Sequence, residues 1–229
     1  MMKWLYGGIG LMAAFCLMLV VLITSAEAVV YFQEDYFEKE YQKYGVLGQV
    51  HMEMDDLLYV TDEMLEYLRN EREDLVVKAT VDGKVREFFN EKEKRHMADV
   101  QELFVGAQRL RLAGVGLAVV LSAVLLLKRQ GRLLFQTMQW GIGLFVAAGG
   151  VLALLLSMNF KRYFIWFHLL FFDNEDWLLN PKTDRLINIV PEGFFRDTAF
   201  FITGVFLAAS LAIWFLAGFL KRAQNRGML

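Results

Sequence analysis

The sequence predicts a mainly α-helical membrane protein with four transmembrane helices, a small extracytoplasmic α/β cap domain and an aromatic interfacial segment. The 229 residues are 56% hydrophobic and yet 22% charged. This composition is too apolar for an ordinary soluble domain and too charged for bare membrane helices. The charges are also segregated, because four long runs contain none. These runs are residues 4–26, 112–127, 133–160 and 198–220.

The four charge-free runs measure 23, 16, 28 and 23 residues. A helix needs roughly 20 apolar residues to cross a bilayer, so only the second run is short. Cationic residues flank that run on both sides, and long cationic side chains can snorkel to the membrane surface. We therefore expect four spans. They divide the chain into segments 1–30, 31–106, 107–159, 160–195 and 196–229.

The first span has an alternative interpretation, since Ala26-Glu27-Ala28 resembles the small-x-small cleavage site of a signal peptide. The charge-free run before it is long for the apolar region of such a peptide, so we expect an uncleaved anchor. Cys16 lies within this run and is the single cysteine of the sequence. It excludes a disulfide within one chain, and we interpret it as a small apolar residue.

The orientation follows from the positively charged ends of the spans. The short loop 128–132 carries three cations, the tail 221–226 carries three more, and Lys3 precedes the first span. Short cation-rich loops stay in the cytoplasm, so we expect both termini and this loop there. Residues 31–106, with 19 acidic and 10 basic residues, and the aromatic segment 160–195 are then extracytoplasmic.

Local patterns predict three elements in the cap domain. Thr61-Asp62-Glu63 has the hydroxyl and acids of a helix start. Two short runs, 76–81 and 84–88, flank Asp82-Gly83, which predicts a β-hairpin with a tight turn. Asn90-Glu91-Lys92-Glu93 resembles a capping box and opens a second helix, which we expect to run on towards the second span.

The histidines are the candidate reactive groups. His96 and Asp99 share a helix face at i and i+3, where a carboxylate can orient an imidazole and raise its basicity; spacing alone favours the alternative, a surface ion pair. His168 lies in the aromatic segment, where desolvation disfavours the charged imidazole; the alternative is a satisfied histidine in an interfacial anchor. We interpret His51 as an exposed loop residue.

Several classes of site have no signal in this sequence. There is no HExxH, no CxxC, no GxSxG turn and no basic stripe. Glycine pairs occur inside the predicted spans, where glycine permits close helix packing. We therefore expect no metal, no cofactor and no nucleic-acid partner.

Two stretches, residues 89–100 and 167–197, carry a family resemblance. Their specific parts are H-M-x-D-V at 96–100, F-H-x-x-F-F at 167–172, N-x-x-W at 174–177, and L-I with P-E-x-F-F at 186–195. Over its full length the chain resembles the lipoprotein intramolecular transacylase (Lit) family, four-span membrane proteins of low-GC Gram-positive bacteria. Both histidines of the family pattern are matched, by His96 and His168.

The resemblance implies an acyltransferase of the bacterial cell membrane with its active site on the extracytoplasmic face. Its substrates would be diacylglyceryl-modified bacterial lipoproteins, and membrane lipid would surround it. The sn-2 acyl chain would move from the diacylglyceryl-cysteine to the cysteine α-amino group and leave a lyso-form lipoprotein. Exchange of an ester for an amide runs downhill, so no cofactor is needed.

The resemblance also implies site residues, with His96 and His168 as the catalytic pair. We expect His96, beside Asp99, to act as the base, and neutral His168 to donate a hydrogen bond to the oxyanion. The opposite assignment stays open, because Asp173 and Asp176 could reach His168. Both histidines should face one cavity open to the outer leaflet. The expected supporting residues are Asp99, Asp176 and Trp177, and the expected substrate-binding residues are Phe167, Phe171 and Phe172.

Two other classes remain compatible with the residues. One is a non-catalytic membrane sensor or interaction protein, whose histidines would be replaceable. The other is a lipid-ester hydrolase, which would release an acyl chain without acylating the amine.

Overall fold

The computed structural model describes residues 2–33 and 35–225, so the predicted tail cation Arg226 lies outside the described residues. The chain forms two compact units. The membrane unit comprises Met1–Val29, Gln108–Met158 and Phe200–Leu229. The histidine unit, which holds all three histidines, comprises Val30–Ala107 and Asn159–Ala199.

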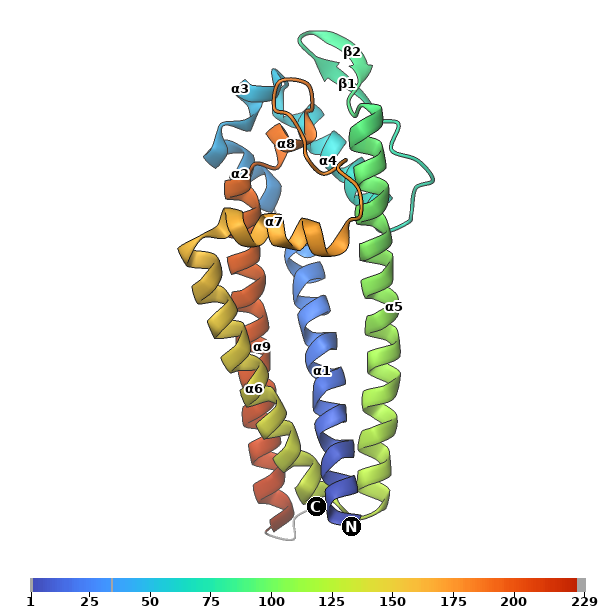
Figure 1. Cartoon of the computed structure of the whole chain (residues 1–229), viewed down its shortest axis with the longest axis vertical. Helices are drawn as coiled ribbons and strands as arrows, with labels where there is room; N and C mark the ends of the chain where they lie inside the picture. Colours follow the sequence, from blue (N-terminus) through green and yellow to red (C-terminus); the bar gives the residue numbers. More distant parts are fainter. Residues whose placement is uncertain (1, 34, 226–229) are drawn as a thin grey trace. The chain divides into compact units, whose positions relative to one another are not determined.

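The membrane unit is built from four long helices, α1 (Met2–Phe32), α5 (Glu91–Leu127), α6 (Gly131–Met158) and α9 (Glu192–Asn225) (Figure 1). Each contains a window of mean hydropathy between 2.2 and 2.5, and each is long and apolar enough to cross a membrane. The predicted fold class, a mainly helical membrane protein with four candidate spans, is therefore confirmed.

Close packing around α1 holds the membrane unit together. Two buried clusters join the helices: Ala13 with Leu125 and Leu134, and Met18 with Ile142 and Phe206. At Gly141 of α6, an added Cβ would overlap the methyl group of Ala14 in α1. Small residues thus let these two backbones approach each other closely, as is common between transmembrane helices.

The histidine unit contains several short elements besides the first turns of α5 and α9. They are α2 (Tyr36–Tyr44), α3 (Val46–Val50), α4 (Met54–Leu68), β1 (Lys78–Val81), β2 (Lys84–Glu87), α7 (Phe160–Phe171) and α8 (Leu186–Ile189). The strands pair antiparallel, with Val81 opposite Lys84. Asp82 and Gly83 between them have φ of 52° and 69°, as a tight hairpin turn requires. The predicted hairpin is confirmed.

The predicted helix start at Thr61 is wrong, because α4 begins at Met54 and Thr61 lies in its middle. The acids Asp55 and Asp56 occupy the first turn instead. Thr61 Oγ1 donates to the Leu57 carbonyl at 2.8 Å and is 2.6 Å from the Tyr41 hydroxyl. Its hydroxyl is therefore satisfied within the helix, and a threonine followed by acids did not mark a boundary here.

The capping box at the start of α5 is confirmed. Asn90 Oδ1 accepts hydrogen bonds from the Lys92 and Glu93 amides at 2.9 and 3.0 Å. Glu93 Oε2 in turn accepts from the Asn90 amide at 2.7 Å. From this cap α5 runs unbroken to Leu127, so His96 and the second charge-free run share one helix, as predicted.

Candidate active site

Two histidines from distant parts of the sequence meet inside the histidine unit. His96 lies near the start of α5 and His168 in the last turn of α7. Their ring centroids are 6.0 Å apart with an interplanar angle of 34°, although 72 positions separate them in the sequence. Each is only 7% exposed. A close pair of buried imidazoles is a candidate for acid–base chemistry.

The backbone of α7 fixes the tautomer of His168. Its Nδ1 lies 2.7 Å from the carbonyl oxygen of Phe164, one turn earlier. A carbonyl only accepts hydrogen bonds, so Nδ1 carries the proton and donates it. The neutral ring has one N–H, and this contact uses it. Nε2 is left with a lone pair, which can accept a proton.

Aromatic rings enclose the pair. Phe172 stands edge-on to His96, with centroids 5.2 Å apart, and lies 5.4 Å from His168. Trp177 lies 4.9 Å from His168 at an interplanar angle of 32°. Phe164 approaches His168 to 4.3 Å. These rings replace water around both imidazoles, which disfavours their charged forms.

Burial and, to a smaller extent, the neighbouring His168 together lower the pKa of His96 to about 4, against the opposing carboxylates of Asp99 and Asp176. Burial also lowers the pKa of His168, while its hydrogen bond to Phe164 opposes that shift. The prediction that Asp99 makes His96 the more basic ring is wrong, because desolvation outweighs the carboxylate. The prediction that desolvation disfavours charged His168 is confirmed. Both rings are neutral at neutral pH.

The loop between α7 and α9, residues 172–191 with the short helix α8 inside it, is fastened to the first turns of α5. Glu93 is 1% exposed, and its Oε1 accepts a hydrogen bond from the Leu186 amide at 2.6 Å. Lys92 Nζ donates to the Leu178 carbonyl at 2.5 Å. Glu93 therefore both caps α5 and anchors the loop, and it fixes the position of the loop relative to the start of α5.

Two further contacts fasten the loop beside His96. Arg95 forms a bidentate pair with Asp176, with nitrogen–oxygen distances of 2.8 and 2.9 Å. Asn174 Nδ2 donates to Asp99 Oδ2 at 2.8 Å. Positions 92, 95, 96 and 99 follow helical i, i+3, i+4 spacing, so these contacts flank His96 along α5. They hold Phe172 and Trp177, on the same loop, against the histidines.

The residues expected to support the pair fall into two groups. Trp177 does contact His168. Asp176 instead bonds to Arg95, and Asp99 to Asn174. Within the described residues no hydrogen bond joins Asp99 to His96, and Nδ1 of His96 is buried without a partner. The predicted orienting hydrogen bond from Asp99 is therefore not formed.

The residues expected to bind substrate differ in their exposure. Phe172 is buried against both histidines. Phe167 meets the His168 ring edge-on at 5.5 Å and is 47% exposed. Phe171 is 49% exposed and contacts Phe167 at 4.7 Å. Phe167 and Phe171 thus extend an aromatic surface outward from the pair.

Sequence reasoning missed the partners that build the site, above all the Phe164 carbonyl, Arg95 and Asn174. One signal was available for Phe164, which stands four positions before His168, where side chains can bond back to a helix carbonyl. Arg95 gave no signal, because its partner lies 81 positions away. Asn174 stands in the matched N-x-x-W pattern, but spacing did not reveal its partner Asp99, 75 positions away.

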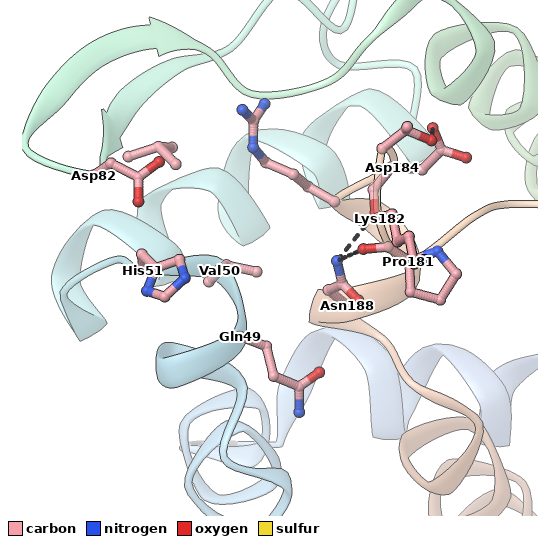
Figure 2. A pocket seen from close by; sticks show the side chains of 11 residues that line it. Gln49, Val50, His51, Asp82, Pro181, Lys182, Asp184 and Asn188 are labelled. Atoms are coloured by element: carbon pink, nitrogen blue, oxygen red, sulfur yellow. Dashed lines mark hydrogen bonds between the residues drawn. The ribbon is translucent and has the colours of Figure 1, made fainter.

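His51 lies apart from this arrangement, as predicted, in an exposed turn. It lines two surface hollows of about 170 and 300 Å³. Figure 2 shows the smaller one, with His51 and Asp82 facing Pro181 and Asn188 across it. Neither hollow is lined by His96 or His168, so neither is the predicted cavity. Among the described residues no three metal-ligating side chains gather in one place.

Comparisons with known proteins agree with this architecture. A family model described as lipoprotein intramolecular transacylase Lit matches residues 11–195. A solved structure of the membrane integral lipoprotein intramolecular transacylase Lit from Bacillus cereus is similar with a TM-score of 0.82 and 22% identity, over 98% of this chain and 99% of that one. A structure of a variant of that protein, with one histidine changed to alanine, is similar with a TM-score of 0.78 and 22% identity, over 98% of this chain and 97% of that one. A search of curated protein sequences returns no match.

The solved structures share the fold, and the family model covers most of the sequence. The chain is therefore a multi-pass integral membrane protein and an acyltransferase, and it belongs to the lipoprotein intramolecular transacylase Lit family.

Proposed function

We propose that the protein moves the sn-2 acyl chain of a diacylglyceryl-cysteine lipoprotein to the cysteine α-amino group, giving the lyso-form lipoprotein, by histidine acid–base catalysis. The observation that carries this proposal is the pair His96 and His168, 6.0 Å apart in a buried aromatic site. Family membership supports the lipoprotein substrate.

His168 acts as the base in this proposal. Its single N–H is committed to the Phe164 carbonyl, so Nε2 can take a proton but the neutral ring has no second N–H to offer an oxyanion. This reverses the roles expected from the sequence. The lowered pKa keeps His168 neutral and ready to accept a proton at neutral pH.

His96 supplies the hydrogen bond to the oxyanion. Its pKa of about 4 makes it a poor base, and it stays neutral with one N–H. Its buried Nδ1 has no partner in the described structure, so a substrate group can satisfy it. Donors in a dry site stabilise a developing oxyanion far better than donors in water.

The reaction balances without a covalent enzyme intermediate. The substrate ammonium first loses one proton to solvent, because only the neutral amine attacks. The nitrogen then forms a bond to the ester carbonyl carbon while His168 takes a second proton from it. When the tetrahedral intermediate collapses, the carbon–oxygen bond to glycerol breaks and His168 gives that proton to the leaving oxygen. Amine and ester belong to one molecule, so proximity is already supplied.

Exposed apolar residues of α7 receive the acyl chains. Phe167, Leu170 and Phe171 follow i, i+3, i+4 spacing, and each is at least 47% exposed. Such a face suits lipid chains that arrive from the membrane. In this proposal the histidine pair lies on the extracytoplasmic face, where lipoproteins are displayed, and the cation-rich loop 128–132 and both termini are cytoplasmic; the cations of that short loop support this orientation.

The test uses the full-length protein in liposomes with a diacylglyceryl-cysteine lipopeptide whose two acyl chains differ in length. Transacylation leaves the intact mass unchanged, and fragment ions place the sn-2 chain on the amine. Loss of a chain with a free amine identifies a hydrolase instead. An unchanged substrate identifies a non-catalytic protein, and either result overturns the proposal.

A further inference from the structure

We propose that Asp99 binds the α-ammonium group of the substrate's N-terminal cysteine beside the histidine pair. This inference rests on the proposed function and deepens it, since it assigns the residue that recognises the free amine. It also gives Asp99 a direct role toward substrate, in place of the orienting role toward His96 that the structure does not support.

A carboxylate is needed because of the charge on the substrate. A free α-amine has a pKa of about 7.7–8.0, so it arrives mostly protonated at neutral pH. The phenyl and indole rings around His96 and His168 offer that cation no hydrogen-bond acceptor, and the neutral imidazoles carry no negative charge to balance it; burying an unpaired charge is costly. An ammonium group that is to reach this site therefore requires a negatively charged acceptor at its edge.

Three other carboxylates near the start of α5 are already engaged. Both oxygens of Asp176 are held by Arg95. Glu93 accepts two backbone amides and is buried. Asp184, also buried, accepts from the Asn180 amide and from two side chains. Each of these groups serves the fold and has little capacity left for a ligand.

Asp99 differs in having one oxygen to spare. Oδ2 accepts a hydrogen bond from Asn174 at 2.8 Å. Within the residues that the structure describes, Oδ1 receives no hydrogen bond and the carboxylate joins no ion pair, and the residue is partly exposed. Asn174 holds the group in place while the free oxygen remains open to an incoming N–H.

The position of Asp99 places that oxygen next to the chemistry. It follows His96 by three positions on α5, and residues at this spacing are neighbours on a helix surface. Asn174 belongs to the same loop as Phe172, whose ring is 5.2 Å from His96. An ammonium group bound to Asp99 would therefore lie beside His96, whose buried Nδ1 has no hydrogen-bond partner among the described residues.

The experiment measures binding with no acyl transfer. Two diacylglyceryl lipopeptides carry an ether in place of the sn-2 ester, and one of them has hydrogen in place of the α-amine. At pH 6.5 the amine is protonated, and wild-type protein in liposomes should bind the amine ligand about tenfold more tightly than the des-amino ligand, as expected for one charge-assisted hydrogen bond. Asp99→Asn should reduce this ratio to near one.

Matched variants separate this role from a structural one. Asp173→Asn removes one negative charge from an exposed neighbour of Asn174 and should leave the ratio unchanged. Asp99→Glu should restore part of it. The inference is overturned if the affinity ratio is unchanged in Asp99→Asn, or if wild-type protein binds the amine and des-amino ligands equally tightly. The ether ligands have no sn-2 acyl chain to transfer, so this result is independent of whether wild-type protein transacylates an ester substrate.

Discussion

The two units of this protein are specified in different ways. In the membrane unit, only 33% of the most apolar window of α1 and 11% of the other three windows are buried, and the hydroxyls of Ser25, Thr137 and Ser157 donate to carbonyls of their own helices. In the histidine unit, buried polar groups such as Glu93 and His168 join segments far apart in sequence. Hydropathy defines the first unit, whereas individual contacts define the second.

The comparison predicts the largest single effects at the histidine pair. His168→Ala and His96→Ala should each lower the transacylation rate by about 10²–10⁴-fold, the range of acid–base catalysis, measured by mass spectrometry of the acyl position. The thermal midpoint should also fall in both variants, because each removes a buried ring packed against aromatic side chains and leaves a cavity, so the rates are compared at a temperature where each variant is still folded. His51→Ala is the control and should be fully active; full activity in either of the first two variants contradicts the mechanism.

Glu93 should show the strongest effect on stability. Glu93→Ala leaves the Asn90 and Leu186 amides without their acceptor, and each unsatisfied buried donor costs about 1–3 kcal/mol. Unfolding in detergent, followed by heat or denaturant, should report the loss. Glu91→Ala changes an exposed acid two positions earlier on α5 and should be far milder. Equal effects in the two variants would show that the anchor to the loop contributes nothing.

How far the sequence could predict each unit follows from this contrast. The spans, the turn at Asp82-Gly83 and the capping box at Asn90 are local patterns, and all are confirmed. Thr61 misled because a hydroxyl that bonds back within a helix has the same local sequence as a cap. The His168 tautomer and the Arg95–Asp176 pair depend on the folded chain, which no spacing reveals.

The membrane unit should be sensitive only where its helices touch. Gly141→Ala puts a methyl group against Ala14, and overpacking typically costs about 1–3 kcal/mol. Gly143→Ala, two positions away on α6, has open space around it, so the better helix propensity of alanine should make it neutral or slightly stabilising, by up to about 1 kcal/mol. Thermal unfolding of both variants in detergent tests the difference; a loss in Gly143→Ala alone would contradict this packing.

A smaller effect concerns pH and stability. The pKa of His96 is about 4 in the folded protein against an ordinary 6.5, so between these values the unfolded chain binds the proton and the folded chain does not. The free energy of unfolding therefore suffers no loss from His96 above about pH 6.5. Below that pH it declines, because the unfolded chain gains a proton on His96 that the folded chain does not bind until the pH nears 4. The melting midpoint should drop between pH 7.5 and 5. The melting midpoint of His96→Phe should drop less over the same pH range. An identical dependence of the midpoint on pH in the two proteins would contradict the lowered pKa of His96.

The central claim is that His168 is the base and His96 the hydrogen-bond donor, and single-turnover rates of the two glutamine variants test it most directly. Glutamine can donate a hydrogen bond but cannot exchange a proton near neutral pH. His96→Gln should therefore keep a measurable fraction of the wild-type rate, clearly above His96→Ala, whereas His168→Gln should be as inactive as His168→Ala. The opposite result, with activity retained in His168→Gln and lost in His96→Gln, would contradict the account and exchange the two roles.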